Sequence, residues 1–181
     1  MSRLPDISED QLTEEQKPTY DELTAGRGVR GPFNAWLRVP EFADLAQKMG
    51  NYLRFRSSVS KKLIEFAVTI TTRHLSAQYG FLSHSKQAQE LGVSPDVISA
   101  IIERRKPNFQ DAEEEAVYDF CQELNVEHVV SDSTYQVALK KFGEKGVVDL
   151  IAACGYYTLV SMTLNATNVG IAEGIDPPLP D

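Results

Sequence analysis

The sequence predicts an all-α fold of about seven helices. Three observations lead to this prediction: apolar residues recur at spacings of three and four, residues typical of helix N-caps precede several such segments, and glycine or proline follows them. No alternating apolar pattern bounded by hairpin turns indicates a strand. The length of 181 residues suits one domain with a sizeable core.

Each predicted helix has a local start or stop signal. Thr-Glu-Glu-Gln at 13–16 fits a capping box, and three glycines with one proline mark an irregular loop over 25–32. Pro40 and Pro95 stand where helices begin, and Gly92 stands where one ends. The predicted helices, in chain order, span residues 13–24, 40–53, 61–73, 76–91, 94–106, 111–125, 133–142 and 146–168.

Charge and composition exclude several classes of function. The chain carries 18 Lys and Arg against 26 Asp and Glu, and this net charge of −8 disfavours a nucleic-acid partner. Residues 1–16 are acidic and lack the apolar stretch of a signal peptide. Residues 150–172 carry no charge but hold several Ser, Thr and Asn, so they predict a buried helix rather than a membrane span. We therefore expect a cytoplasmic protein without a membrane partner.

Glu65 and His84 are the first candidates for chemistry. Glu65 lies among apolar residues of the helix predicted over 61–73, where a carboxylate is costly unless it is paired. It is either part of a structural ion pair or a general acid or base. One straight helix over 61–91 would separate Glu65 from His84 by about 28 Å. A break at 74–76, with Ser76 as the expected N-cap, instead lets the second helix fold back and brings the two side chains level.

The residues around this pair resemble the signature of the carboxymuconolactone decarboxylase and alkylhydroperoxidase-like (AhpD-like) superfamily. The matching positions are Glu65, Ala77-Gln78-Tyr79-Gly80-Phe81-Leu82-Ser83-His84, Ala88, Gly31-Pro32-Phe33, Arg73-His74, 155–160 and Asn165. The resemblance covers most of residues 30–170. It implies an AhpD-like helical fold that assembles into homo-oligomers, typically trimers or hexamers. It also implies a decarboxylase-like domain over 31–172, with an N-terminal helix and loop over 1–30 packed on it and a tail over 173–181.

The cysteine positions separate the two branches of this superfamily. The peroxidase branch has two cysteines between the Glu and the His, at the slots that Ala77 and Gly80 occupy here. Cys121 and Cys154 lie in other predicted helices and are interpreted as buried small apolar residues. Thiol peroxidase chemistry needs a thiolate and a resolving thiol in reach, so the dithiol route of the family is not expected.

The remaining resemblance is to the decarboxylase branch. It implies a cofactor-free lyase, without a metal, that acts on a carboxylated lactone or a similar small organic acid, with His84 as proton donor and Glu65 orienting it. A dianionic substrate needs local positive charge, for which Arg73 is the preferred candidate and Arg30 and Arg38 are the next. The residues expected to bind substrate are Tyr79, Arg73, His74, Phe33 and Asn165.

One departure leaves alternatives open. Decarboxylase-like members often have Tyr-Glu-Trp where this chain has Tyr79-Gly80-Phe81. The glycine removes a side chain from the expected pocket wall, which either enlarges the site, changes the substrate or marks the loss of decarboxylation. The alternatives are an oxidoreductase-type homologue without thiol peroxidase activity and a non-catalytic, oligomeric ligand-binding protein.

Overall fold

The computed structural model describes residues 2–26 and 28–180, and within these ranges every regular element is a helix and no strand is present. This confirms the all-α prediction. Met1 of the predicted N-terminal segment, Arg27 of the predicted loop and Asp181 of the predicted tail lie outside the described residues. A short 3₁₀ turn at Glu9–Gln11 is followed by α1 (Lys17–Gly26), α2 (Pro32–Trp36), α3 (Pro40–Phe55), α4 (Lys61–His74), α5 (Gln78–Glu90), α6 (Pro95–Ile102), α7 (Ala112–Val126) and α8 (Asp132–Thr167).

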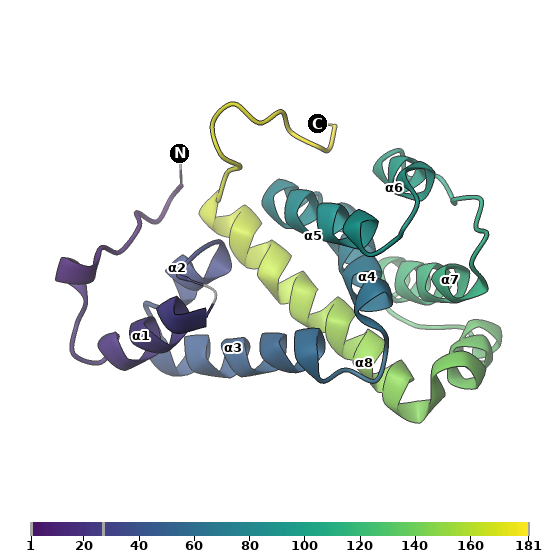
Figure 1. Ribbon diagram of the computed structural model, residues 1–181, viewed down its shortest axis with the longest axis horizontal. Helices are drawn as coiled ribbons and strands as arrows, with labels where there is room; N and C mark the ends of the chain where they lie inside the picture. Colours follow the sequence, from purple (N-terminus) through teal and green to yellow (C-terminus); the bar gives the residue numbers. More distant parts are fainter. Residues whose placement is uncertain (1, 27, 181) are drawn as a thin grey trace.

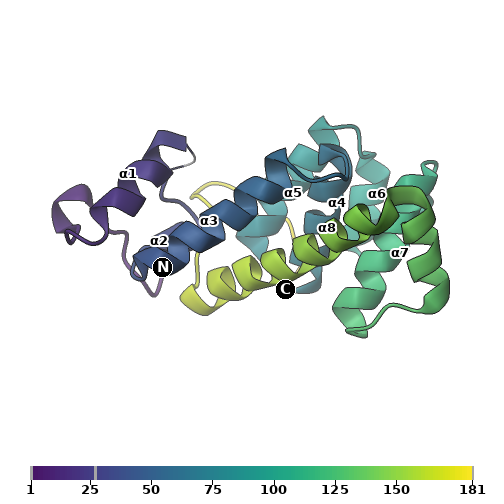
Figure 2. The ribbon, with the colours of Figure 1, turned by 90° about the horizontal axis from the view of Figure 1, so that it is seen from below.

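The long helix α8 divides the molecule. Helices α1 to α3 lie on one side of it and α4 to α7 lie on the other (Figure 1), and the view from below places α1 at the far end of the N-terminal side (Figure 2). Helix α4 packs against α5, α7 and α8. Phe66, Phe120 and Leu150, one from each of α4, α7 and α8, have no exposed surface, so the core sits where these three helices meet.

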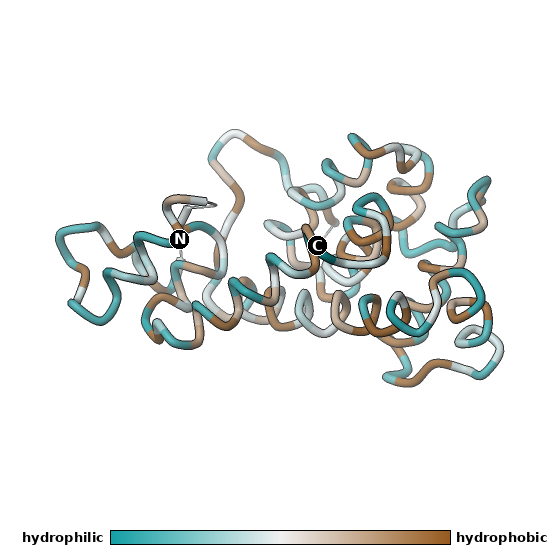
Figure 3. Tube along the Cα trace, turned by 60° about the horizontal axis from the view of Figure 1, so that its bottom comes forward, coloured by the Kyte–Doolittle hydropathy of each residue, from teal (hydrophilic) through white to brown (hydrophobic). Residues whose placement is uncertain are grey.

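Hydrophobic and hydrophilic residues alternate around the turns of the helices (Figure 3), as expected for helices that bury one face. Among the described residues, α8 is the one helix long and apolar enough, by length and composition alone, to cross a membrane. Within its most apolar stretch 56% of the residues are buried inside the protein. Its contacts with α4 and α7 are those of a core helix.

Helix α3 buries Leu53 together with its small residues and leaves its other large apolar residues exposed. Of the apolar positions that define this helix in the sequence, Leu45 is 59% exposed and Met49 is 42% exposed. The cause is a close helix contact, since a Cβ atom on Gly50 would lie 2.8 Å from the Tyr156 hydroxyl oxygen. Only small side chains fit this contact, so of the apolar residues spaced along this helix Ala46 and Leu53 are buried while the larger side chains at 42, 45 and 49 stay exposed.

Two helix boundaries differ from the sequence prediction for the same reason. Ser76, expected to begin α5, adopts the left-handed conformation (φ 49°) and instead ends α4. The Ala77 N–H donates to the Thr72 carbonyl at 2.9 Å, as in a Schellman motif. Arg104 (φ 57°) plays the same part after α6, which therefore ends at Ile102 rather than at 106. Glycine usually marks this position, so the sequence indicates the break at 74–76 but not the left-handed conformation of Ser76, and it does not indicate the stop at Arg104.

The break predicted at Gly143 is present. Gly143 has φ 67° and ψ 178°, and the two predicted helices over 133–142 and 146–168 are the two arms of α8 on either side of this kink. The helix starts predicted at 61 and 111 are also confirmed, since Ser60 and Asp111 are N-caps whose side chains each accept a hydrogen bond from a backbone N–H of the first turn.

Candidate active site

Helices α4 and α5 form an antiparallel hairpin that brings Glu65 and His84 together. His84 Nδ1 lies 2.6 Å from Glu65 Oε2. Glu65 is 1% exposed, and 14% of the His84 side chain is exposed. The Asn165 side-chain amide donates to the Leu75 carbonyl at 2.8 Å and so ties α8 to the turn of the hairpin. The contact expected from the break in the sequence is therefore present.

The geometry of this contact determines which ring nitrogen can react. Because Nδ1 is the nitrogen bound to the carboxylate, Nδ1–H donates to Glu65 and Nε2 is left for exchange with a ligand. Among the described residues, His84 is the only hydrogen-bond partner of the Glu65 carboxylate. The Tyr157 ring packs edge to face against the imidazole, with 4.8 Å between ring centroids. Carboxylate and ring together fix the tautomer and the orientation of His84.

Close packing at Gly80 allows this contact. Gly80 precedes His84 by one helical turn, and a Cβ atom on it would lie 3.0 Å from Thr72 Cγ2 on α4 and 3.6 Å from Leu164 Cδ1 on α8. A larger side chain would push α5 away from α4. Gly80 also lines the cavity described next. A Cβ atom on Gly80 would, however, point at α4 and α8, so the glycine is needed for the close contact between the helices.

A cavity of about 280 Å³ opens beside His84. It lies between α5, α8, the end of α3 and the loop before α2, and it includes two arginines, Arg30 and Arg54, while no Asp or Glu is among the described residues that line it. Arg54 Nε is buried and has no hydrogen-bond partner among the described residues. The cavity is thus a positive site on a protein of net charge −8.

Two of the expected substrate-binding residues line this cavity. Phe33 and Tyr79 contribute to its wall. The loop before α2 lies directly on the tyrosine, since a Cβ atom on Gly31 (φ 57°) would lie 2.9 Å from Tyr79 Cε1. Only glycine combines this backbone conformation with this close approach.

The structure places Arg73, His74 and Asn165 outside the cavity. Arg73 is buried and donates from Nε to the Ile102 carbonyl at 2.9 Å, which fastens the end of α6 to the α4–α5 turn. His74 lies beside Arg104, and its pKa is lowered, first by burial and then by that arginine. Arg73 and Asn165 each donate to a backbone carbonyl at a helix end, and this contact accounts for their positions.

The arginines are distributed differently from the sequence expectation. Arg30 lines the cavity, whereas Arg38 donates to the Asn34 carbonyl at 2.7 Å and the Pro5 carbonyl at 2.8 Å and holds the N-terminal segment. Arg54 is the residue that sequence reasoning missed. It stands near the end of a helix, where a basic residue is ordinary, and no sequence signal distinguishes it.

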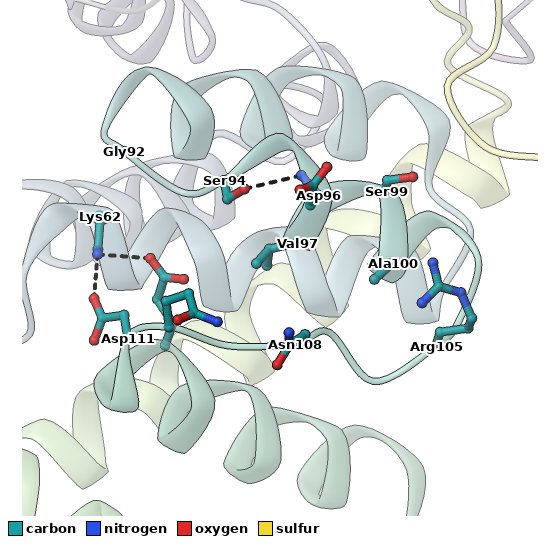
Figure 4. A pocket seen from close by; sticks show the side chains of 12 residues that line it. Lys62, Gly92, Ser94, Asp96, Val97, Ser99, Ala100, Arg105, Asn108 and Asp111 are labelled. Atoms are coloured by element: carbon teal, nitrogen blue, oxygen red, sulfur yellow. Dashed lines mark hydrogen bonds and ion pairs between the residues drawn. The ribbon is translucent and has the colours of Figure 1, made fainter.

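A larger cavity of about 620 Å³ lies between α4, α6 and α7 (Figure 4). The half-buried Lys62 in its wall is already neutralised, because Nζ lies 2.7 Å from Asp111 and 2.8 Å from Glu114. Among the described residues, no group of three or more His, Cys, Asp or Glu side chains is arranged to hold a metal ion. The cavity beside His84 is the one that combines an acid–base pair with uncompensated positive charge.

No protein-family model matches the sequence, and no curated protein matches it significantly. Solved structures do match. A peroxidase-related protein from a Silicibacter species has a TM-score of 0.74 at 17% identity, over 94% of this chain and 90% of that one. A protein described as an alkylhydroperoxidase AhpD core, from Ralstonia eutropha, has a TM-score of 0.77 at 16% identity, over 95% and 93%.

A third structure comes from Agrobacterium tumefaciens and is described as a candidate antioxidant defence protein, AhpD; its TM-score is 0.67 at 14% identity, over 79% of this chain and 99% of that one. Fold and site together define an all-α protein built on a helical hairpin with a buried Glu–His pair. The fold is the AhpD-like fold.

Proposed function

We propose that this protein is an enzyme that delivers a proton to a carbon atom of a small carboxylated substrate. The reaction we propose is decarboxylation of a carboxylated lactone or a similar small organic acid. The single observation that supports the proposal best is the 2.6 Å contact between Glu65 and His84 at the wall of a cavity with two arginines. This arrangement joins a proton carrier to a binding site for anions.

The arginines supply the binding. A guanidinium group binds a carboxylate through two parallel hydrogen bonds and stays charged at any working pH. Arg54 Nε is buried without a described partner, and a buried donor left unsatisfied costs about 1–3 kcal/mol. A substrate carboxylate in the cavity would satisfy it. Arg30 reaches the same cavity from the loop before α2, so the two groups can hold the two carboxylates of a dianion.

The chemistry needs one proton and one electron sink. As the bond to the carboxylate carbon breaks, CO₂ leaves and the electron pair moves into the conjugated lactone carbonyl, which forms an enolate. Tyr79, in the cavity wall, is positioned to donate to the enolate oxygen. His84 Nε2–H then protonates carbon, and Glu65 stabilises the positive ring before the transfer. A solvent proton restores Nε2.

The experiment is a thermal-shift screen followed by turnover. Lactone and muconate-type acids are compared with their methyl esters, because ligands that bind the native state raise its melting temperature. We expect acids to raise it and esters to leave it unchanged. The best acid is then assayed for CO₂ release with the wild type and with His84→Gln. Equal turnover in both proteins, or equal shifts by acid and ester, would exclude the proposal.

A second candidate, a non-catalytic oligomeric ligand-binding protein, is favoured by one surface feature. Large apolar side chains remain exposed along α3 and α8, including Leu45 (59%), Phe55 (72%) and Met162 (57%). Such surfaces usually mark contacts with another protein. We expect self-association through this face, and Leu45→Glu should weaken it in sedimentation velocity while Leu91→Glu, on α5–α6, should not. Binding of acids without any CO₂ release would favour this second candidate.

A further inference from the structure

A pair of cysteines lies on another part of the molecule. Cys121 on α7 and Cys154 on α8 are 33 residues apart in the chain, yet their sulfur atoms lie 3.5 Å apart. Both are buried, at 0% and 3% exposed, and both are free thiols. A disulfide bond has an S–S length of about 2.05 Å, so roughly 1.5 Å of further approach joins them. The sequence interpretation as isolated apolar residues does not account for this contact.

Cys154, but not Cys121, lines a cavity of about 290 Å³. The cavity shares no lining residue with the one beside His84. Its wall combines polar groups with apolar ones; these include His74, His128, Asn125, Leu124, Ile151 and Met162. A small molecule that enters the cavity therefore meets Cys154 first, with Cys121 directly behind it.

The two thiols have different electrostatic surroundings. The pKa of Cys154 is lowered, first by its hydrogen bond with Cys121, which outweighs the opposing effect of burial. The pKa of Cys121 is raised well above its ordinary value by the hydrogen bond with Cys154 and by burial. Because Cys154 lines the cavity and Cys121 lies behind it, access assigns Cys154 as the reacting thiol and Cys121 as the resolving thiol, and the two pKa directions agree with this order.

We propose that Cys121 and Cys154 are a redox-active pair that a small hydroperoxide oxidises to an intramolecular disulfide. The size of the oxidant follows from access. Cys154 is only 3% exposed at the wall of a cavity of about 290 Å³. If the oxidant were a large external disulfide, it would have little room to align its two sulfur atoms with the attacking thiolate. Hydrogen peroxide, by contrast, fits easily. The proposal is independent of the reaction at His84.

The chemistry balances in two steps. The Cys154 thiolate attacks one peroxide oxygen, the O–O bond breaks, and the leaving oxygen takes a proton to form an alcohol, or water in the case of hydrogen peroxide. Cys154 is then a sulfenic acid. The Cys121 sulfur attacks the Cys154 sulfur, the S–O bond breaks, and hydroxide leaves with the Cys121 proton as water. The two sulfurs supply the two electrons that reduce the peroxide.

The experiment follows thiols and intact mass of the full chain in hydrogen peroxide. We expect the wild type to lose both thiols together and the mass of two hydrogen atoms, and dithiothreitol to restore both. In Cys154→Ser, the Cys121 thiol should survive in hydrogen peroxide at least tenfold longer than it does in the wild type. Cys121→Ser should stop at a sulfenic acid that a cyclic diketone captures. Loss of only one thiol in the wild type, or equally fast oxidation of Cys154→Ser, would overturn the proposal.

Two further variants test whether the oxidant enters through this cavity and whether the folded protein is the species that reacts. Gly155 lines the same cavity, and a Cβ atom there meets no other atom within 4 Å, so Gly155→Leu should narrow the cavity and slow oxidation several-fold. Ser94→Ala removes the N-cap of α6, away from the pair, and destabilises the fold. Oxidation at the wild-type rate is expected in Ser94→Ala. Acceleration in step with its unfolded fraction would show that only unfolded chains react and would overturn the proposal.

Discussion

Two buried carboxylates, Asp149 and Glu65, are each 1% exposed and are satisfied in opposite ways. Asp149, on α8, accepts four hydrogen bonds: from the Tyr52 hydroxyl, the Ser57 hydroxyl, and the N–H and hydroxyl of Ser58. Glu65 has one described partner, His84, at 2.6 Å. The donors around Asp149 are neutral and fixed, whereas the partner of Glu65 can gain or lose a proton.

This difference separates a structural carboxylate from a chemical one. Burying a charge is costly unless hydrogen bonds or an opposite charge compensate it. Four neutral donors compensate Asp149 completely and join the α3–α4 connection to α8. An imidazole that lines a cavity compensates Glu65 while keeping one nitrogen for a ligand. The number and kind of partners, rather than burial itself, indicates which carboxylate takes part in chemistry.

The largest effect is expected from His84→Gln. The amide keeps a hydrogen bond to Glu65 but cannot carry the proton, so turnover of the acid found by thermal shift should fall by about 10²–10⁴-fold. The melting temperature should stay close to that of the wild type. Steady-state CO₂ release and a thermal melt check both expectations. A turnover within threefold of the wild type would contradict the assigned role.

Asp149→Asn should give the reverse pattern. The Asn side chain replaces one carboxylate oxygen by an NH₂ group, which cannot accept the hydrogen bonds that this oxygen received. We therefore expect a loss of about 3 kcal/mol in the free energy of unfolding. Turnover at saturating substrate should remain within about twofold. Urea titration gives the stability and the same CO₂ assay gives the activity. A stable Asp149→Asn would show that the four hydrogen bonds matter little.

The stability of the protein should depend on pH through Asp149. Burial is the largest single influence and raises the pKa of this carboxyl, but the hydrogen bonds from Tyr52, Ser58 and Ser57 together hold it below its ordinary value. A carboxyl with a lowered folded-state pKa contributes stability that is fully present above the unfolded-state pKa of about 3.9. That stability is lost as the pH falls toward the folded-state pKa. Urea midpoints measured from pH 6 down to pH 3 should fall less steeply in Asp149→Asn.

Arg54→Gln tests the ligand side of the Glu65 site. Removing the guanidinium should raise KM for the acid roughly tenfold, because one charged hydrogen-bonding partner is lost, and should change kcat much less. Arg38→Gln is the matched control, since that side chain holds backbone carbonyls outside the cavity. Equal KM values for Arg54→Gln and the wild type would remove Arg54 from the binding site.

The smallest effect is expected from Ser57→Ala. This change removes one of the four hydrogen bonds to Asp149, of 3.0 Å, and should cost about 1 kcal/mol in the free energy of unfolding. Urea titration measures it, and turnover should not change. A cost equal to that of Asp149→Asn would mean that the four hydrogen bonds act as one unit.

The sequence predicts the helices and the Glu65–His84 contact because both depend on local signals. Apolar spacing, the caps at Ser60 and Asp111, and the break before α5 act over a few residues each. Once two neighbouring helices fold back on each other, their lengths largely determine which side chains come into contact. The stop at Arg104 and the left-handed conformation of Ser76 escaped the sequence, because glycine, which usually marks this conformation, is absent from both positions.

By itself, then, the sequence determined an all-α chain, its helix segments and one buried acid–base pair in a hairpin. Only the tertiary structure decided that Arg54 rather than Arg73 faces the cavity, and that Cys121 meets Cys154. These choices depend on how α3, α7 and α8 approach one another across long stretches of chain. Such approaches are set by close contacts, as at Gly50 and Tyr156, which no local pattern of residues encodes.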